Sequence, residues 1–189
     1  MKDLAISYSY DGRISSQKRI QAVGLLRANP DIRFEGYLYA EPTDRKSKLA
    51  RGLLSVLVAK LQGDPYVSEL ERGTKLSPEQ YYTLLGRSKI ALSLRGGGFD
   101  TLRYWEIVAS KPLLVSEWPD IAIPHNFEHG KQAVFCRPDL SDRMEVVRYY
   151  VQHDEEREAV TANGYAHLLK YQTCERRAES FPDICRRSL

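Results

Sequence analysis

Short stretches in which apolar and polar positions alternate are separated by stretches of helical periodicity, and this pattern recurs along the whole chain. It predicts strands at residues 3–9, 32–40, 67–70, 90–94, 112–117 and 133–136. It predicts helices at residues 17–28, 49–61, 78–88, 100–109, 139–152 and 154–171, the last with a kink or break at Asn163 and Gly164. Strands that alternate with helices indicate an α/β fold, a doubly wound, Rossmann-like, mainly parallel sheet with helices on both faces.

The most informative stretch is residues 88–106, which predicts a strand, a glycine loop and the start of a helix. Glycine is unfavourable inside strands and helices, so the strand is expected to end at Gly96, Gly97 and Gly98. Asp100 or Thr101 can then cap the helix that follows. A glycine turn that leads into a helix presents backbone N–H groups and the positive end of the helix dipole, which suits a phosphate group.

Arg103 and Glu106 lie three residues apart, and therefore on one face of the first two turns of this helix. In that position Arg103 could bind a phosphate group, and Glu106 could accept hydrogen bonds from ribose hydroxyls. The spacing is equally typical of a surface salt bridge between the two side chains on an ordinary helix. Both interpretations stay open on these residues alone.

The segment SKIALSLRGGGFDTLRYWEIVASKPLLVSE resembles the nucleotide-sugar-binding segment of GT-B glycosyltransferases, particularly the bacterial CgeB-like group and more distantly the exostosin-like enzymes. In these families a motif of the form R-G-x-G-x-x-[ST]-x-R-x-x-E follows a strand, and a helix end of small residues and a buried strand come next. Its most specific part here is Thr101, Arg103 and Glu106 together. The similarity extends over residues 80–180.

The resemblance implies that the glycine loop and Thr101 lie against the diphosphate of the donor, that Arg103 reaches phosphate and that Glu106 holds the donor ribose. The implied donor-binding residues are Arg95, Gly96, Gly97, Gly98, Thr101, Arg103 and Glu106. Two positions depart from the family pattern. Gly98 stands eight residues before Glu106, where many retaining GT-B enzymes have a glutamate, and Lys111 stands where the families usually have glycine.

Basic residues at the start of the first predicted helix are further candidates. In an open α/β sheet the loop after the first strand and the start of this helix would lie at the same edge as the glycine loop. Their basic side chains are therefore possible phosphate contacts. The residues are Arg13, Lys18 and Arg19. Ordinary solvated side chains are the alternative, and the better expectation for at least two of the three. Glu117, Asp120 and His125 lie on a plausible loop but are each more simply surface residues, so no catalytic residue is identified.

A GT-B glycosyltransferase has two Rossmann-like halves, and the resemblance is to the donor-binding half alone. We therefore expect a single nucleotide-sugar-binding domain over residues 1–189, with residues 153–189 as C-terminal helices and tail. It would bind a nucleotide-diphosphate sugar as donor substrate, without a separate cofactor, and transfer the sugar with help from a second domain, a subunit or a second copy. The apolar helix at 49–61 could contribute an interface. The alternative is a non-catalytic nucleotide- or glycan-binding module derived from a transferase half.

Composition argues against several other classes. The chain is 42% apolar and 28% charged and has no apolar run of membrane length, which indicates a soluble protein without a membrane span. The early charges at the N-terminus do not resemble a secretion signal, so a cytoplasmic location is expected. The 28 basic and 25 acidic residues are interspersed, without the basic stripe of a nucleic-acid-binding protein. The three cysteines are expected to be free thiols, and His125 and His129 do not predict a metal site.

Overall fold

The computed structural model describes residues 2–10, 14–40, 76–95 and 98–187 of the 189-residue chain. The strands are β1 Lys2–Tyr10, β2 Phe34–Ala40, β3 Ser88–Ser93, β4 Leu113–Glu117 and β5 Val134–Cys136. The helices are α1 Ile14–Arg27, α4 Pro78–Gly86, α5 Leu102–Ala109, α6 Arg143–Gln152, α7 Asp154–Tyr171 and α8 Cys174–Arg187. The helix predicted at 49–61 and the strand predicted at 67–70 lie outside the described residues.

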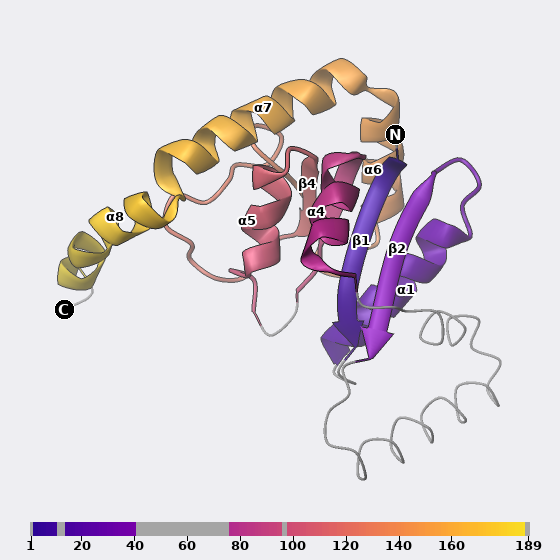
Figure 1. Cartoon of the computed structure of the whole chain (residues 1–189), viewed down its shortest axis with the longest axis horizontal. Helices are drawn as coiled ribbons and strands as arrows, with labels where there is room; N and C mark the ends of the chain where they lie inside the picture. Colours follow the sequence, from indigo (N-terminus) through magenta and orange to yellow (C-terminus); the bar gives the residue numbers. More distant parts are fainter. Residues whose placement is uncertain (1, 11–13, 41–75, 96–97, 188–189) are drawn as a thin grey trace, which may run out of the picture.

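The described strands form one sheet in the order β2-β1-β3-β4-β5, and all neighbouring strands are parallel. Figure 1 shows β1 and β2 side by side and running in the same direction. The register runs straight across the sheet: Leu4 lies beside Phe34 on one side and beside Ile90 on the other, and Ile90 lies beside Leu113. The winding reverses between β1 and β3, because β2 lies on one side of β1 and β3 on the other. The predicted doubly wound, mainly parallel α/β sheet is confirmed.

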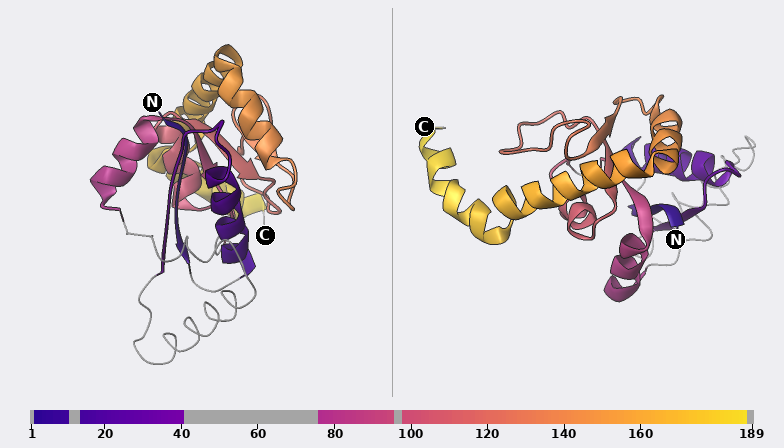
Figure 2. Two further views of the ribbon diagram at one scale, coloured as in Figure 1. Left: turned by 90° about the vertical axis from the view of Figure 1, so that its right-hand side faces the viewer. Right: turned by 90° about the horizontal axis from the view of Figure 1, so that it is seen from above.

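Helices cover both faces of this sheet, as the two views of Figure 2 show. One face packs against α1 and α6 through a cluster that includes Ile90 and Leu92, and the other packs against α4 and α5 through a cluster that includes Ala91. Alternate residues of β3 therefore pack into opposite cores, which explains why this strand is buried along almost its whole length. Helix α7 contributes to both cores, since Val160 belongs to the first cluster and Leu168 to the second.

Helix α4 begins where the sequence predicts, because its first turn forms a capping box. The hydroxyl of Ser77 accepts a hydrogen bond from the backbone N–H of Gln80 at 3.2 Å, and the Gln80 side chain accepts one from the N–H of Ser77 at 2.9 Å. Pro78 follows the cap, where it removes an N–H group that a helix start leaves unused. Local chemistry thus fixes the start of the helix that leads into β3.

Other predicted boundaries are wrong, for reasons that are not local in sequence. Helix α6 starts at Arg143 instead of residue 139, because Leu140 is buried in a turn with a φ of 59°. Helix α7 continues through Asn163 and Gly164, so the chain does not break the helix there. Most of the predicted C-terminal tail forms helix α8, which projects from the body of the molecule (Figure 1).

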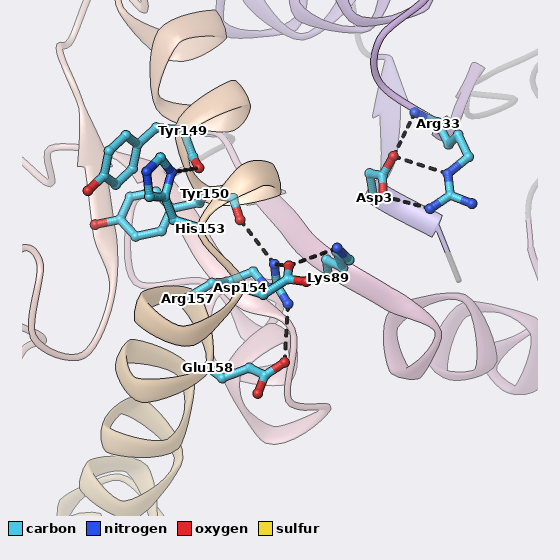
Figure 3. A network of polar contacts seen from close by, with 9 residues as sticks. All are labelled: Asp3, Arg33, Lys89, Tyr149, Tyr150, His153, Asp154, Arg157 and Glu158. Carbon is cyan, nitrogen blue, oxygen red and sulfur yellow. Dashed lines mark hydrogen bonds and ion pairs between the residues drawn. The ribbon is translucent and has the colours of Figure 1, made fainter.

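A polar network ties the junction of α6 and α7 to the sheet (Figure 3). Arg157 is buried, donates a hydrogen bond to the carbonyl of Tyr150 at 3.1 Å, and forms ion pairs with Asp154 and Glu158. Asp154 also accepts a hydrogen bond from Lys89 of β3 at 2.8 Å. The hydrogen bonds from Lys89 and Arg157 lower the pKa of Asp154 to about 2. The network lies at the amino end of β3, away from the glycine loop that follows its carboxyl end.

Candidate functional site

Residues 94–101 connect the carboxyl end of β3 to the start of α5, and β3 is one of the two strands between which the winding reverses. The chain leaves β3 at Ser93 and enters α5 at Leu102. Open α/β sheets bind ligands outside the carboxyl edge at such a reversal. Gly96 and Gly97 themselves lie outside the described residues, and an added side-chain carbon at Gly98 would meet no atom within 4 Å.

Helix α5 begins directly after the loop, and its first turn presents backbone N–H groups at the positive end of the helix dipole. Thr101 is the N-cap residue, with an extended backbone, and its side chain makes no capping hydrogen bond. One of these groups, the N–H of Tyr104, donates a hydrogen bond to the carbonyl of Thr101 at 3.0 Å. The order of strand, loop and helix is therefore as predicted, with Thr101 as the cap.

A buried carboxylate holds the first residue of the loop. Glu117, the last residue of β4, is only 2% exposed, and its Oε1 atom accepts a hydrogen bond from the backbone N–H of Arg95 at 2.5 Å. The guanidinium of Arg19 donates two hydrogen bonds, of 3.2 and 3.0 Å, to the carbonyl of Arg95. Both backbone polar groups of Arg95 are thus fixed, while its own guanidinium lies 5.0 Å from the centre of the Phe99 ring.

The basic residues of α1 lie at this edge, as predicted. Lys18 places its Nζ atom 3.5 Å from Oε2 of Glu117 and donates a hydrogen bond to the carbonyl of Pro138 at 2.7 Å. Arg19 is buried. The expectation that at least two of the three basic residues are simply solvated is therefore wrong, since Lys18 and Arg19 both bind protein groups; Arg13 lies outside the described residues.

The prediction that Glu117 is a surface residue on a loop is also wrong, because this carboxylate is buried at the end of a strand that is covered on both faces. The one signal in the sequence is that Glu117 directly ends the apolar run of residues 112–117. A charge at the end of such a run can be buried when the neighbouring loop supplies a donor, and only the sheet order shows that Arg95 does so.

Arg103 and Glu106 are both half-buried on α5. Glu106 accepts a hydrogen bond at its Oε1 atom from the hydroxyl of Tyr82, on α4, at 2.9 Å. This bond is the main cause of a raised pKa of Tyr82, since it favours the neutral phenol. Tyr82 lies 24 residues before Glu106, so no spacing rule in the sequence predicts that the two side chains meet.

The remaining candidate side chains belong to the segment between β4 and β5. His125 is exposed and its ring stacks on that of Tyr171, and the Nδ1 atom of His129 accepts a hydrogen bond from the N–H of Phe135 at 3.0 Å. Asp120 is exposed, as expected. In the part of the chain that the structure describes, no three His, Cys, Asp or Glu residues lie together in a way that could hold a metal ion. The three cysteines are free, as predicted.

Comparison with known families identifies the kind of protein in which this arrangement occurs. The model of the family described as glycosyl transferase-like matches residues 42–183, which is most of the chain. The chain belongs to the glycosyl transferase-like family. No curated protein sequence matches it.

Solved structures with the fold of this glycosyl transferase-like chain include both an isolated domain and longer proteins. The C-terminal domain of LpcC, a glycosyl transferase group 1 family protein from Francisella tularensis, has a TM-score of 0.57 at 15% identity, over 91% of this chain and 87% of that one. Anabaena HepE in complex with UDP-glucose has a TM-score of 0.63 at 10% identity, over 98% of this chain and 49% of that one. TarM of S. aureus has a TM-score of 0.60 at 16% identity, over 95% of this chain and 34% of that one.

These similarities confirm the predicted resemblance to GT-B glycosyltransferases and the fold of one Rossmann-like half. The glycosyl transferase-like chain spans most of the LpcC domain but less than half the length of HepE or TarM. Among its described helices, none is both long and apolar enough to cross a lipid bilayer.

The departure at Lys111 has a simple structural meaning in this glycosyl transferase-like chain. Lys111 follows the C-cap of α5 and has a φ of 68°, a left-handed conformation that glycine adopts most easily. The glycine expected from the resemblance would fit the same backbone. Lysine is accommodated there with its Nζ atom 4.9 Å from the centre of the Tyr165 ring on α7.

Proposed function

We propose that this chain is the donor-binding domain of a glycosyltransferase, which binds a nucleotide-diphosphate sugar at the carboxyl edge of its sheet. The observation that carries the proposal is the match of residues 42–183 to the glycosyl transferase-like family, together with a glycine loop that enters α5 directly before Arg103 and Glu106. The complex of HepE with UDP-glucose supports a nucleotide sugar as the ligand class.

In this proposal the diphosphate lies against the Gly96–Gly98 loop, Thr101 and the first N–H groups of α5. Arg103 and Arg95 supply positive charge, and Lys18 adds more from α1. Arg19 acts indirectly, because its guanidinium donates hydrogen bonds to the carbonyl of Arg95 and so holds the backbone of that residue. When the sugar leaves, negative charge increases on the diphosphate, and donors that are already in place stabilise that charge.

We assign the binding of the acceptor, and the group that activates it, to a second domain or a second chain. No carboxylate or imidazole of the described residues can be assigned as the catalytic base. We propose that residues 1–189 act as one domain whose activity requires a second domain, a subunit or a second copy. A longer protein is consistent with the share of HepE and TarM that the chain spans.

A non-catalytic nucleotide- or glycan-binding module is the second candidate. The observation that favours it is Gly98, which occupies the position of a glutamate in many retaining GT-B enzymes. A transfer assay with activated sugars separates the two candidates, because the module would bind a nucleotide without transferring any sugar, alone or with its partner.

The test of the donor site is calorimetric titration of the chain with UDP, GDP and CDP. Replacing Glu106 with alanine removes hydrogen bonds to a charged acceptor, roughly 1.5–3 kcal/mol in total, so the affinity for the nucleotide should fall about 10- to 150-fold. Arg103→Ala should weaken binding of the diphosphate similarly. Glu145→Ala, which removes an exposed carboxylate on α6, is the matched control and should bind as the wild type does. Equal affinity of Glu106→Ala and wild type would contradict the site assignment.

A further inference from the structure

The contact between Tyr82 and Glu106 joins the two helices that flank β3 in sequence. Helix α4 leads into this strand and α5 follows it, and both pack on the same face of the sheet, where Leu85 and Ile107 share a core cluster. Because both helices are fixed to one core, the 2.9 Å hydrogen bond from Tyr82 to Glu106 spans two rigid supports. Such a bond can set the direction of the Glu106 carboxylate.

The geometry leaves a defined set of acceptor positions. A carboxylate has two oxygens with about four lone-pair positions in all, and Tyr82 occupies one of those on Oε1. The other positions on the two oxygens are the ones that a ligand could use. Two adjacent hydroxyl donors, such as the 2′ and 3′ hydroxyls of a ribose, match a carboxylate held in this way.

Tyr82 is suited to act only as a donor in this pair. Its hydrogen bond to Glu106 raises the pKa of the phenol above its ordinary value, so the hydroxyl keeps its proton at physiological pH. Tyr82 is 47% exposed, so its packing contributes less than that of a core residue. Loss of the hydroxyl should therefore alter the carboxylate without disturbing the fold.

We infer that Tyr82 is a positioning residue that orients the Glu106 carboxylate and so sets a preference for ribose over 2′-deoxyribose in the bound nucleotide. The inference rests on the proposed function, since it assumes that Glu106 receives the ribose hydroxyls. Tyr82 acts through Glu106 and needs no contact with the ligand.

The test compares the ribonucleotides UDP, GDP and CDP with their 2′-deoxy counterparts by calorimetric titration, in wild type and in Tyr82→Phe. The ratio of the two affinities should fall by about fivefold in the variant, the effect of one ordinary hydrogen bond. The melting temperature should stay unchanged. In a Glu106→Gln background, the further change Tyr82→Phe should leave the ratio unaltered, because the positioned group is already gone.

Tyr149→Phe is the matched control. Tyr149 is 43% exposed and donates the same kind of hydrogen bond, 2.7 Å long, to Oε2 of Glu156, at the α6–α7 junction. It should leave the affinity ratio unchanged.

The outcomes separate this inference from the proposed function. If Tyr82→Phe weakens the binding of ribo- and deoxyribonucleotides equally, or weakens the binding of neither, the positioning role of Tyr82 is refuted while the proposed donor site stands. If the wild type binds none of the nucleotides, the proposed donor site fails and the role of Tyr82 fails with it.

Discussion

Gly164 permits a close approach that no other residue could make without moving the backbone. It is buried in the middle of α7, and a side-chain carbon added there would lie 2.3 Å from the carbonyl oxygen of Gln132 and 3.6 Å from Cγ1 of Val108. Carbon and oxygen would have to separate to at least 3.0 Å. The obstructing atom belongs to backbone next to Ala133, a core residue with no exposed surface, so it cannot move as a flexible side chain could.

The size of the effect follows from two opposing contributions. Alanine favours a helix over glycine by about 1 kcal/mol. Overpacking a rigid core costs about 1–3 kcal/mol and sometimes more, and a clash with backbone lies at the upper end of that range. We therefore expect Gly164→Ala to lower the free energy of unfolding by about 1–2 kcal/mol.

Urea unfolding followed by circular dichroism measures this difference. The matched control is Gly86→Ala at the end of α4, where the added carbon meets nothing within 4 Å. This control should gain up to about 1 kcal/mol, because only the helix preference changes. A Gly164→Ala protein as stable as the wild type, or an equal loss in both variants, would refute the reasoning.

Two further predictions concern buried and paired charges. Glu117→Leu should lower the free energy of unfolding by about 2–4 kcal/mol, because the N–H of Arg95 loses its acceptor. Glu117→Gln keeps an acceptor and should lower it less. Equal losses of the two variants in urea unfolding would contradict this prediction. The hydrogen bonds from Lys89 and Arg157 lower the pKa of Asp154 to about 2. The ionised carboxylate of Asp154 therefore adds to the free energy of unfolding above about pH 4, and this contribution disappears as the pH falls through 2. Asp154→Asn should therefore be less stable than wild type at pH 6, and the difference should vanish near pH 2; a constant difference would contradict it.

Features that depend on neighbouring residues could be predicted from the sequence. The capping box at Ser77 fixes the start of α4, and alternation around Ile90 places β3. The strand ends at Ser93, shortly before the glycines expected to stop it, and Thr101 is the N-cap of α5. In each case the physical cause lies within a few residues of the element it determines.

Features that depend on distant contacts could not be predicted. The sequence pattern predicts that Gly164 interrupts the helix. In the structure the helix is continuous, and glycine is necessary there because the backbone carbonyl of Gln132 lies so close. Glu117 is buried only because β4 lies beside β3 and brings Arg95 within reach. Tyr82 meets Glu106 only because α4 and α5 share one face of the sheet. These contacts arise from the topology, and no local pattern encodes them.

The position of α7 limits how this domain can be recombined with related ones. Its residues Val160 and Leu168 complete two different cores on opposite faces of the sheet. A chimera joined after β5 would combine one parent's sheet with another parent's α7, and two interfaces would then have to fit at once. Exchange of this domain between family members should therefore succeed only when the junction lies beyond Tyr171, so that the sheet and α7 are inherited as one unit.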